Sequence, residues 1–196
     1  MRDFSSLAPP AASVARRGKV RFAALQPEDL LSIDRQASQH LWLGLPGDID
    51  WEQAALLAGQ PVAFCARRAD GSILACFGIN ETFDDVQGVA WALLSDPIGR
   101  DHLALTRFIR EVVASSGYRR IELLAKARES EHDFAFARSH GLMLDTTMMV
   151  NVAMAEPTPE CRWAVLLGFT PAHVLRQFGA ASETYMLFEH IRAAVQ

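Results

Sequence analysis

The chain has 196 residues, of which 50% are hydrophobic, 21% are charged and three are cysteine. This length and apolar content predict one folded domain with a sizeable core and exclude a disordered protein. The formal net charge of −4 offers no basic surface for nucleic acid. No apolar run approaches the length of about eighteen residues that predicts a membrane span.

The three cysteines, Cys65, Cys76 and Cys161, are widely spaced and match neither a metal-binding motif nor a secreted disulfide framework. We interpret them as buried thiols in a reducing compartment, which favours the cytoplasm. His132 and His140 are too far apart to form a metal-binding pair on one helix face. The sequence therefore predicts no metal site.

The N-terminal segment, residues 1–18, is rich in Ala, Pro and Ser, which predicts a flexible arm. The folded domain is expected over residues 19–196. Its first strand is predicted at 20–25. A helix that opens with Pro27 follows, and then a short helix over 50–59.

A β-hairpin is predicted next. Residues 61–67 and 72–79 are β-rich apolar runs, and Asp70-Gly71 between them is a strong turn signal. After the helix that follows, residues 119–127 are predicted as a strand, although their pattern also fits the start of a helix. The remaining elements are a helix over 132–140, a strand over 148–154, a helix over 160–167, and strands over 169–176 and 184–189.

The stretch that organises the chain is a strand, turn and helix over residues 88–116. Residues 89–94 form an uncharged apolar run, and residues 95–99 form the turn. The helix has one apolar face at i, i+3, i+4 and i+7, made of Leu105, Phe108, Ile109 and Val112. The first N–H groups of a helix have no partner inside it, so an anion could bind there. An ordinary strand–helix connection explains the same pattern.

The order of these elements resembles that of the GNAT acyltransferase superfamily. In that family a strand leads into a pyrophosphate turn and a long helix, which correspond here to 90–94, 95–99 and 100–116. Family members also end with a helix, a Gly-Phe step at Gly168-Phe169, and a strand pair. The resemblance implies an α/β (α+β) fold with a mixed, mostly antiparallel central sheet flanked by helices.

A narrower resemblance is to GNAT-like proteins encoded among tailed-phage virion genes, some of which are labelled internal virion protein A. The matching residues are Asp70-Gly71, Phe77-Gly78-Ile79, Trp91, Arg162-Trp163 and Leu167-Gly168-Phe169. This match leaves out residues 128–157, which are then an insertion. Alternatively, 148–154 is the fifth strand of the family fold and 119–140 is an extra helical excursion.

The family's pyrophosphate turn has the form Q/R-x-x-G-x-G/A, in which glycines let phosphate approach backbone N–H groups. Here Gly99 matches the last glycine, but Pro97 replaces the first and Leu94 replaces the Gln or Arg. Proline lacks an N–H, so the resemblance implies a degenerate turn. If acetyl-CoA binds, the resemblance places it against Leu94, Ser95, Gly99, Arg100, Asp101 and His102.

The family's acid–base groups are also missing. Ala164 stands where a tyrosine often protonates the leaving thiolate, and residues 88–94 contain no acid. The remaining candidates are Glu81, His102 and Tyr185, and each is also explained as a solvated or packed side chain. At the start of a helix, the dipole is expected to lower the pKa of His102.

These features predict a virion-associated structural or interaction component on a GNAT scaffold, without a cofactor. The first alternative is an active acetyl-CoA-dependent N-acetyltransferase, and the second is a CoA or nucleotide binder without turnover. The expected partners are other phage virion proteins or a second copy, bound through residues 1–18 and 128–157. The expected location is the host cytoplasm during assembly, and the virion afterwards.

Overall fold

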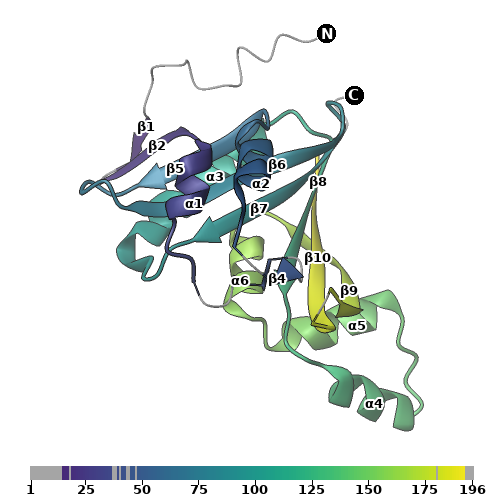
Figure 1. The fold of residues 1–196 in the computed structure, drawn as a ribbon. Helices are drawn as coiled ribbons and strands as arrows, with labels where there is room; N and C mark the ends of the chain where they lie inside the picture. Colours follow the sequence, from purple (N-terminus) through teal and green to yellow (C-terminus); the bar gives the residue numbers. More distant parts are fainter. Residues whose placement is uncertain are drawn as a thin grey trace. The chain divides into compact units, whose positions relative to one another are not determined.

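The computed structural model describes residues 15–17, 19–36, 39, 41–42, 45–46, 48–179 and 181–192 (Figure 1). The chain divides into two compact units. The first unit comprises residues 1–42 and 46–121, and the second comprises residues 43–45 and 122–196. Each unit is described by itself.

The first unit is built on an antiparallel sheet. In spatial order its strands are β1 (Ala15–Arg17), β2 (Val20–Ala24), β5 (Val62–Arg67), β6 (Ile73–Phe83) and β7 (Gln87–Leu94). The predicted hairpin is confirmed as β5 and β6. Gly71 has a φ of +90° and Asp70 accepts a hydrogen bond from the N–H of Ser72, as expected for a tight Asp-Gly turn. The short strands β3 (Leu41–Trp42) and β4 (Leu45–Pro46) form a separate pair.

Two helices cover one face of this sheet, α1 (Pro27–Ser32) and α2 (Trp51–Ala58) (Figure 1). The cluster beneath them is made of small and aliphatic side chains, the two cysteines of this unit and one tryptophan: Leu25, Leu30, Ile33, Ile49, Ala54, Leu57, Ala63, Cys65, Cys76, Trp91 and Leu93. Asp50 begins α2 by accepting a hydrogen bond from the N–H of Gln53 at 2.8 Å.

Because side chains alternate along a strand, Phe64 and Phe77 lie on the other face. There α3 (His102–Ser115) packs with Phe108 stacked on Phe22 at 3.9 Å between ring centroids. The rings of Phe64 and Phe77 meet Phe108 edge-on at 5.4 and 6.1 Å. This face is therefore held by one aromatic cluster.

Two of the four residues predicted for the buried face of α3 lie at its edge. Leu105 and Ile109 are buried as expected, and Val113 continues the buried row. Phe108 and Val112 are half-buried at its edge. The buried row follows i, i+4 and i+8, which runs along the helix at a slight angle to its axis.

The second unit contains most of β8 (Arg120–Lys126) and the rest of the chain. Its other elements are α4 (Glu131–Ser139), α5 (Thr146–Ala155), α6 (Pro159–Leu166), β9 (Thr170–Phe178) and β10 (Glu183–Ile191). The strand order is β8–β10–β9, and β9 and β10 are antiparallel. The predicted strand over 119–127 and the final strand pair are confirmed.

The predicted strand over 148–154 is wrong, because these residues belong to α5. The run is apolar apart from Asn151, and it has no regular alternation that separates a strand from a buried helix. The deciding signal was Asp145, whose side chain caps the helix by accepting from the N–H of Met148 at 2.8 Å. The alternative in which 148–154 is the fifth strand falls with it, since β8 follows α3.

The predicted arm, residues 1–18, is described only in part. Ala15–Arg17 forms β1, which pairs with β2 in the register Ala15 to Phe22, so this end of the segment belongs to the sheet. Residues 1–14 and residue 18 lie outside the described residues.

Candidate functional site

The candidate site is the connection between β7 and α3, residues 95–102, which we call the β7–α3 corner. Ser95 is buried and donates to the carbonyl of Leu74 through its N–H at 3.0 Å and its hydroxyl at 3.1 Å. The Asp96–Pro97 peptide bond is cis, and Gly99 has a φ of +56°. A short 3₁₀ turn, Gly99–Asp101, then leads into α3.

The backbone of Leu94, just before the corner, is already occupied. Its N–H donates to the side-chain oxygen of Gln39 at 2.7 Å, and its carbonyl accepts from the N–H of Gln36 at 2.9 Å. Both glutamines come from the segment after α1. Leu94 is therefore a structural residue that attaches this segment to the end of β7.

Arg68, from the turn between β5 and β6, holds the corner from outside. Its Nε donates to the Asp101 carboxylate at 3.3 Å, and its Nη2 donates to the carbonyl of Pro97. The side chains of Arg68 and Asp101 are 24% and 31% exposed, so this ion pair is only partly shielded from water. The Arg68 guanidinium thus links Pro97 to Asp101 and offsets the negative charge of the Asp101 carboxylate.

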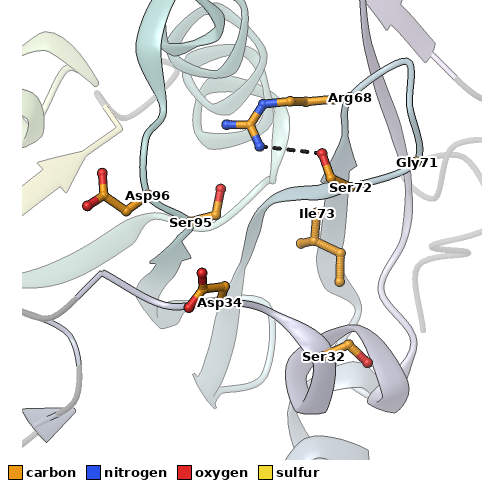
Figure 2. A pocket seen from close by; sticks show the side chains of 8 residues that line it. All are labelled: Ser32, Asp34, Arg68, Gly71, Ser72, Ile73, Ser95 and Asp96. Atoms are coloured by element: carbon orange, nitrogen blue, oxygen red, sulfur yellow. Dashed lines mark hydrogen bonds between the residues drawn. The ribbon is translucent and has the colours of Figure 1, made fainter.

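A hollow of about 380 Å³ lies beside the corner, and Figure 2 shows the side chains that line it. Its lining mixes one guanidinium with two carboxylates, several hydroxyl groups and one apolar side chain: Ser32, Asp34, Arg68, Gly71, Ser72, Ile73, Ser95 and Asp96. The negative charges of two carboxylates, Asp34 and Asp96, disfavour the binding of an anion such as a phosphate in the hollow. The hollow is therefore not an electropositive phosphate site.

His102 lies at the start of α3, as predicted. Burial lowers its pKa, because the charged imidazolium loses contact with water, so the neutral imidazole is favoured. Its carbonyl accepts a hydrogen bond from the hydroxyl of Thr106 at 2.8 Å.

Glu81 lies at the opposite end of β7 from the corner. It pairs with Gly88 near the start of β7, whereas His102 follows the end of that strand. Six residues of extended strand separate Gly88 from Leu94, which is about 20 Å. The structure therefore does not bring Glu81 and His102 together.

The Glu81 carboxylate accepts a hydrogen bond from the N–H of Asp85 at 2.8 Å and lies beside Tyr118. Burial, reinforced by the charge of Glu81 and a hydrogen bond to it, raises the pKa of Tyr118 to about 12. Sequence reasoning missed Tyr118. Its only sequence signal was its position directly after Gly117, between a helix end and a strand.

Tyr185 belongs to β10 in the second unit. Its hydroxyl donates to Glu183 at 3.2 Å, and Glu183 is also paired with Lys126. Burial and the charge of Glu183 raise the pKa of Tyr185, which makes its proton harder to lose.

No protein-family model and no curated protein sequence matches the chain. Solved structures do match over nearly its whole length. Ribosomal-protein-S5-alanine acetyltransferase from Vibrio fischeri superposes with a TM-score of 0.55 at 14% identity, covering 90% of this chain and 95% of that one. A GNAT-family acetyltransferase from Bacillus anthracis superposes with a TM-score of 0.54 at 7% identity, covering 90% and 96%. This chain has the GNAT acetyltransferase fold.

A further match is spermidine N-acetyltransferase from Vibrio cholerae, solved in complex with CoA and spermine. Its TM-score is 0.55 at 10% identity, and the match covers 89% of this chain and 96% of that one. Identities this low establish the GNAT fold and not the activity.

Against the GNAT pattern, the corner is a poor cradle for a pyrophosphate. Pro97 has no N–H, and its carbonyl is engaged by Arg68. The donors that remain are the first N–H groups of the 3₁₀ turn, at Gly99 and Arg100. The corner therefore lacks one of the backbone donors that the GNAT turn uses.

Ala164, which the resemblance places at the position of the GNAT proton donor, is buried in α6 and carries no titratable group. Within the described ranges, no group of three His, Cys, Asp or Glu side chains could hold a metal ion. The part of the chain that the structure describes has no helix long and apolar enough to cross a membrane.

Proposed function

We propose that this GNAT-fold protein acts by binding other proteins and does not transfer acyl groups. The observation that carries the proposal is Pro97, which stands where the GNAT turn has its first glycine and has no N–H to offer a pyrophosphate. Arg68 engages two acceptors of the corner, the Asp101 carboxylate and the Pro97 carbonyl, and links them to the β5–β6 turn. The corner then serves as a structural joint between the β5–β6 turn and α3.

The candidate acid–base residues support the same proposal. The Glu81 carboxylate is bound to the Asp85 N–H, and the Tyr185 hydroxyl is bound to Glu183. Each of these hydrogen bonds competes with a proton transfer between the same group and a substrate. Ala164 contributes no such atom.

The finer proposal is that the partners belong to a tailed-phage particle, and it rests on the residue resemblance described above. The segments proposed to bind them are 1–18 and 128–157. In and around α4, the second segment exposes Phe136, Leu142 and Met143 at 59%, 48% and 84%. Large apolar side chains exposed this strongly favour a contact surface over a solvated loop.

Calorimetric titration with acetyl-CoA tests the main proposal. We expect no saturable heat up to millimolar ligand, because the corner lacks the donors for a pyrophosphate. Saturable binding in the micromolar range would overturn the proposal. A matched Gly99→Val variant then locates the site, because valine is strained at a φ of +56° and would deform the corner only.

Assembly is tested by light scattering on the full chain and on a chain that begins at Ala15. This truncation removes residues 1–14 of the first proposed contact segment and keeps β1 paired with β2. We expect the full chain to self-associate or to bind candidate virion proteins, and the truncated chain to do so less. Equal assembly of the two chains would remove the segment before Ala15 from the proposal.

The active N-acetyltransferase is the second candidate, and two observations favour it. Gly99 keeps the positive φ expected of the last glycine in the turn, and Arg68 neutralises the Asp101 carboxylate that would repel a phosphate. Thiol release from acetyl-CoA in the presence of amine substrates tests it. Turnover that is lost in Gly99→Val would establish this candidate.

A further inference from the structure

Two of the three cysteines face each other across neighbouring strands. Cys65 of β5 and Cys76 of β6 are direct partners in the antiparallel register. Both thiols are free, and the two residues are 1% and 0% exposed. They belong to the same buried cluster beneath α1 and α2, so their side chains lie on the same face of the sheet.

The backbone pattern shows what kind of pair they form. The carbonyl of Ala63 accepts a hydrogen bond from the N–H of Leu25, so Ala63 directs its backbone groups toward β2. Backbone direction alternates along a strand, so Cys65 also faces β2 and makes no backbone hydrogen bonds to Cys76. In such non-hydrogen-bonded pairs the Cα atoms are about 4.5 Å apart and the side chains are closest. A disulfide needs Cα atoms roughly 4.4–6.8 Å apart.

We propose that Cys65 and Cys76 are an oxidation site, at which a peroxide closes a cross-strand disulfide inside the first unit. One thiolate attacks hydrogen peroxide, so that an S–O bond forms, the O–O bond breaks and the released hydroxide is protonated to water. The second thiol then displaces the sulfenic oxygen as a second water, and the S–S bond forms. The two thiols are oxidised by two electrons in total, and the peroxide is reduced.

The buried surroundings of the two thiols slow this reaction. The neighbouring Cys65 thiol and burial raise the pKa of Cys76, so the reactive thiolate is scarce in the folded protein. The pair therefore stays reduced where reductants are abundant. It closes slowly when the protein meets an oxidising environment, and it then ties β5 to β6 covalently.

The third cysteine provides an internal reference. Cys161 is 1% exposed in the second unit, and its thiol donates to the carbonyl of Lys126 at 3.5 Å. Burial raises its pKa also. It lies on the helix α6, so it is not part of the strand register that places Cys65 opposite Cys76. A Cys161→Ser variant therefore leaves the proposed pair intact and removes the only other thiol.

The test treats the full-length protein with hydrogen peroxide under native conditions and then counts thiols after unfolding. We expect the count to fall from three to one in the wild type, with a mass loss of about 2 Da. In Cys161→Ser we expect it to fall from two to none. Trypsin cuts after Arg67 and Arg68, so Cys65 and Cys76 fall in separate peptides that only a disulfide joins. The Tm should rise on oxidation and return with a reductant.

Retention of all three thiols under excess peroxide would overturn the proposal. So would the loss of thiols without a joined Cys65–Cys76 peptide, since that indicates sulfinic acids or a link to Cys161. Cys76→Ser should lose the joined peptide. If that variant does not fold, the peptide map of the wild type decides the question alone.

Discussion

The aromatic cluster under α3 and the β7–α3 corner lie in the same unit but are held together differently. Phe22, Phe64 and Phe77 are 2–6% exposed and converge on Phe108, so burial of apolar surface holds that region. The corner is held by one partly exposed ion pair and a few hydrogen bonds. Such pairs contribute about 0–1 kcal/mol.

This difference explains how the fold can persist while the site changes. Residues in the aromatic cluster cannot be replaced without a large loss of stability, whereas corner residues can change at little cost. A proline can therefore stand in the β7–α3 corner and leave the sheet and α3 intact. The likeness to acetyltransferases at 7–14% identity is a likeness of fold.

The largest expected effect is in the aromatic cluster. Phe22→Ala should lower the free energy of unfolding by about 3–5 kcal/mol, because it removes a fully buried ring stacked on Phe108. Denaturant titration measures the loss. Phe83→Ala is the matched control, since Phe83 is 61% exposed and its loss should stay within about 0.5 kcal/mol. Equal losses in the two variants would mean that burial does not distinguish the cluster from the surface.

At the corner we expect a much smaller effect. Arg68→Ala removes the ion pair to Asp101 and the hydrogen bond to Pro97, and the loss should be about 0.2–1 kcal/mol. Arg107→Ala, an exposed arginine on α3, serves as the control and should be neutral. A loss from Arg68→Ala as large as that from Phe22→Ala would contradict the claim that the corner contributes much less stability than the aromatic cluster.

The smallest effect concerns pH. Burial lowers the pKa of His102 in the folded protein, so the unfolded chain binds its proton more readily below the ordinary value of about 6.5. Stability from this group is therefore present above that pH and is lost as the pH falls through it. His102→Gln should lose less stability than the wild type between neutral and mildly acidic pH.

The fold was largely predictable because its signals are local. Asp70-Gly71 between two β-rich runs predicted the β5–β6 hairpin. The helical spacing of apolar residues after Gly99 predicted α3. The strand predicted over 148–154 was wrong because this run, apolar apart from Asn151, shows no clear strand or helix period, and the cap at Asp145 was the signal that indicated a helix.

The site was less predictable because its contacts are distant in sequence. Arg68 reaches Asp101 across 33 residues, and no spacing rule connects an arginine in a hairpin turn with an aspartate at a helix start. The pairing of Glu81 with Tyr118 likewise depends on the register of β6 and β7 and on the end of α3. Sequence correctly placed the corner and its proline, but not the arginine that engages it.

The most direct test of the central claim is hydrogen exchange at the corner itself. The backbone N–H groups of Gly99 to His102 are followed with and without millimolar acetyl-CoA. If Arg68 and Pro97 have removed the pyrophosphate cradle, the exchange rates of these four N–H groups will be the same in both samples. Slower exchange at these positions in the presence of acetyl-CoA, absent in Gly99→Val, would contradict the account.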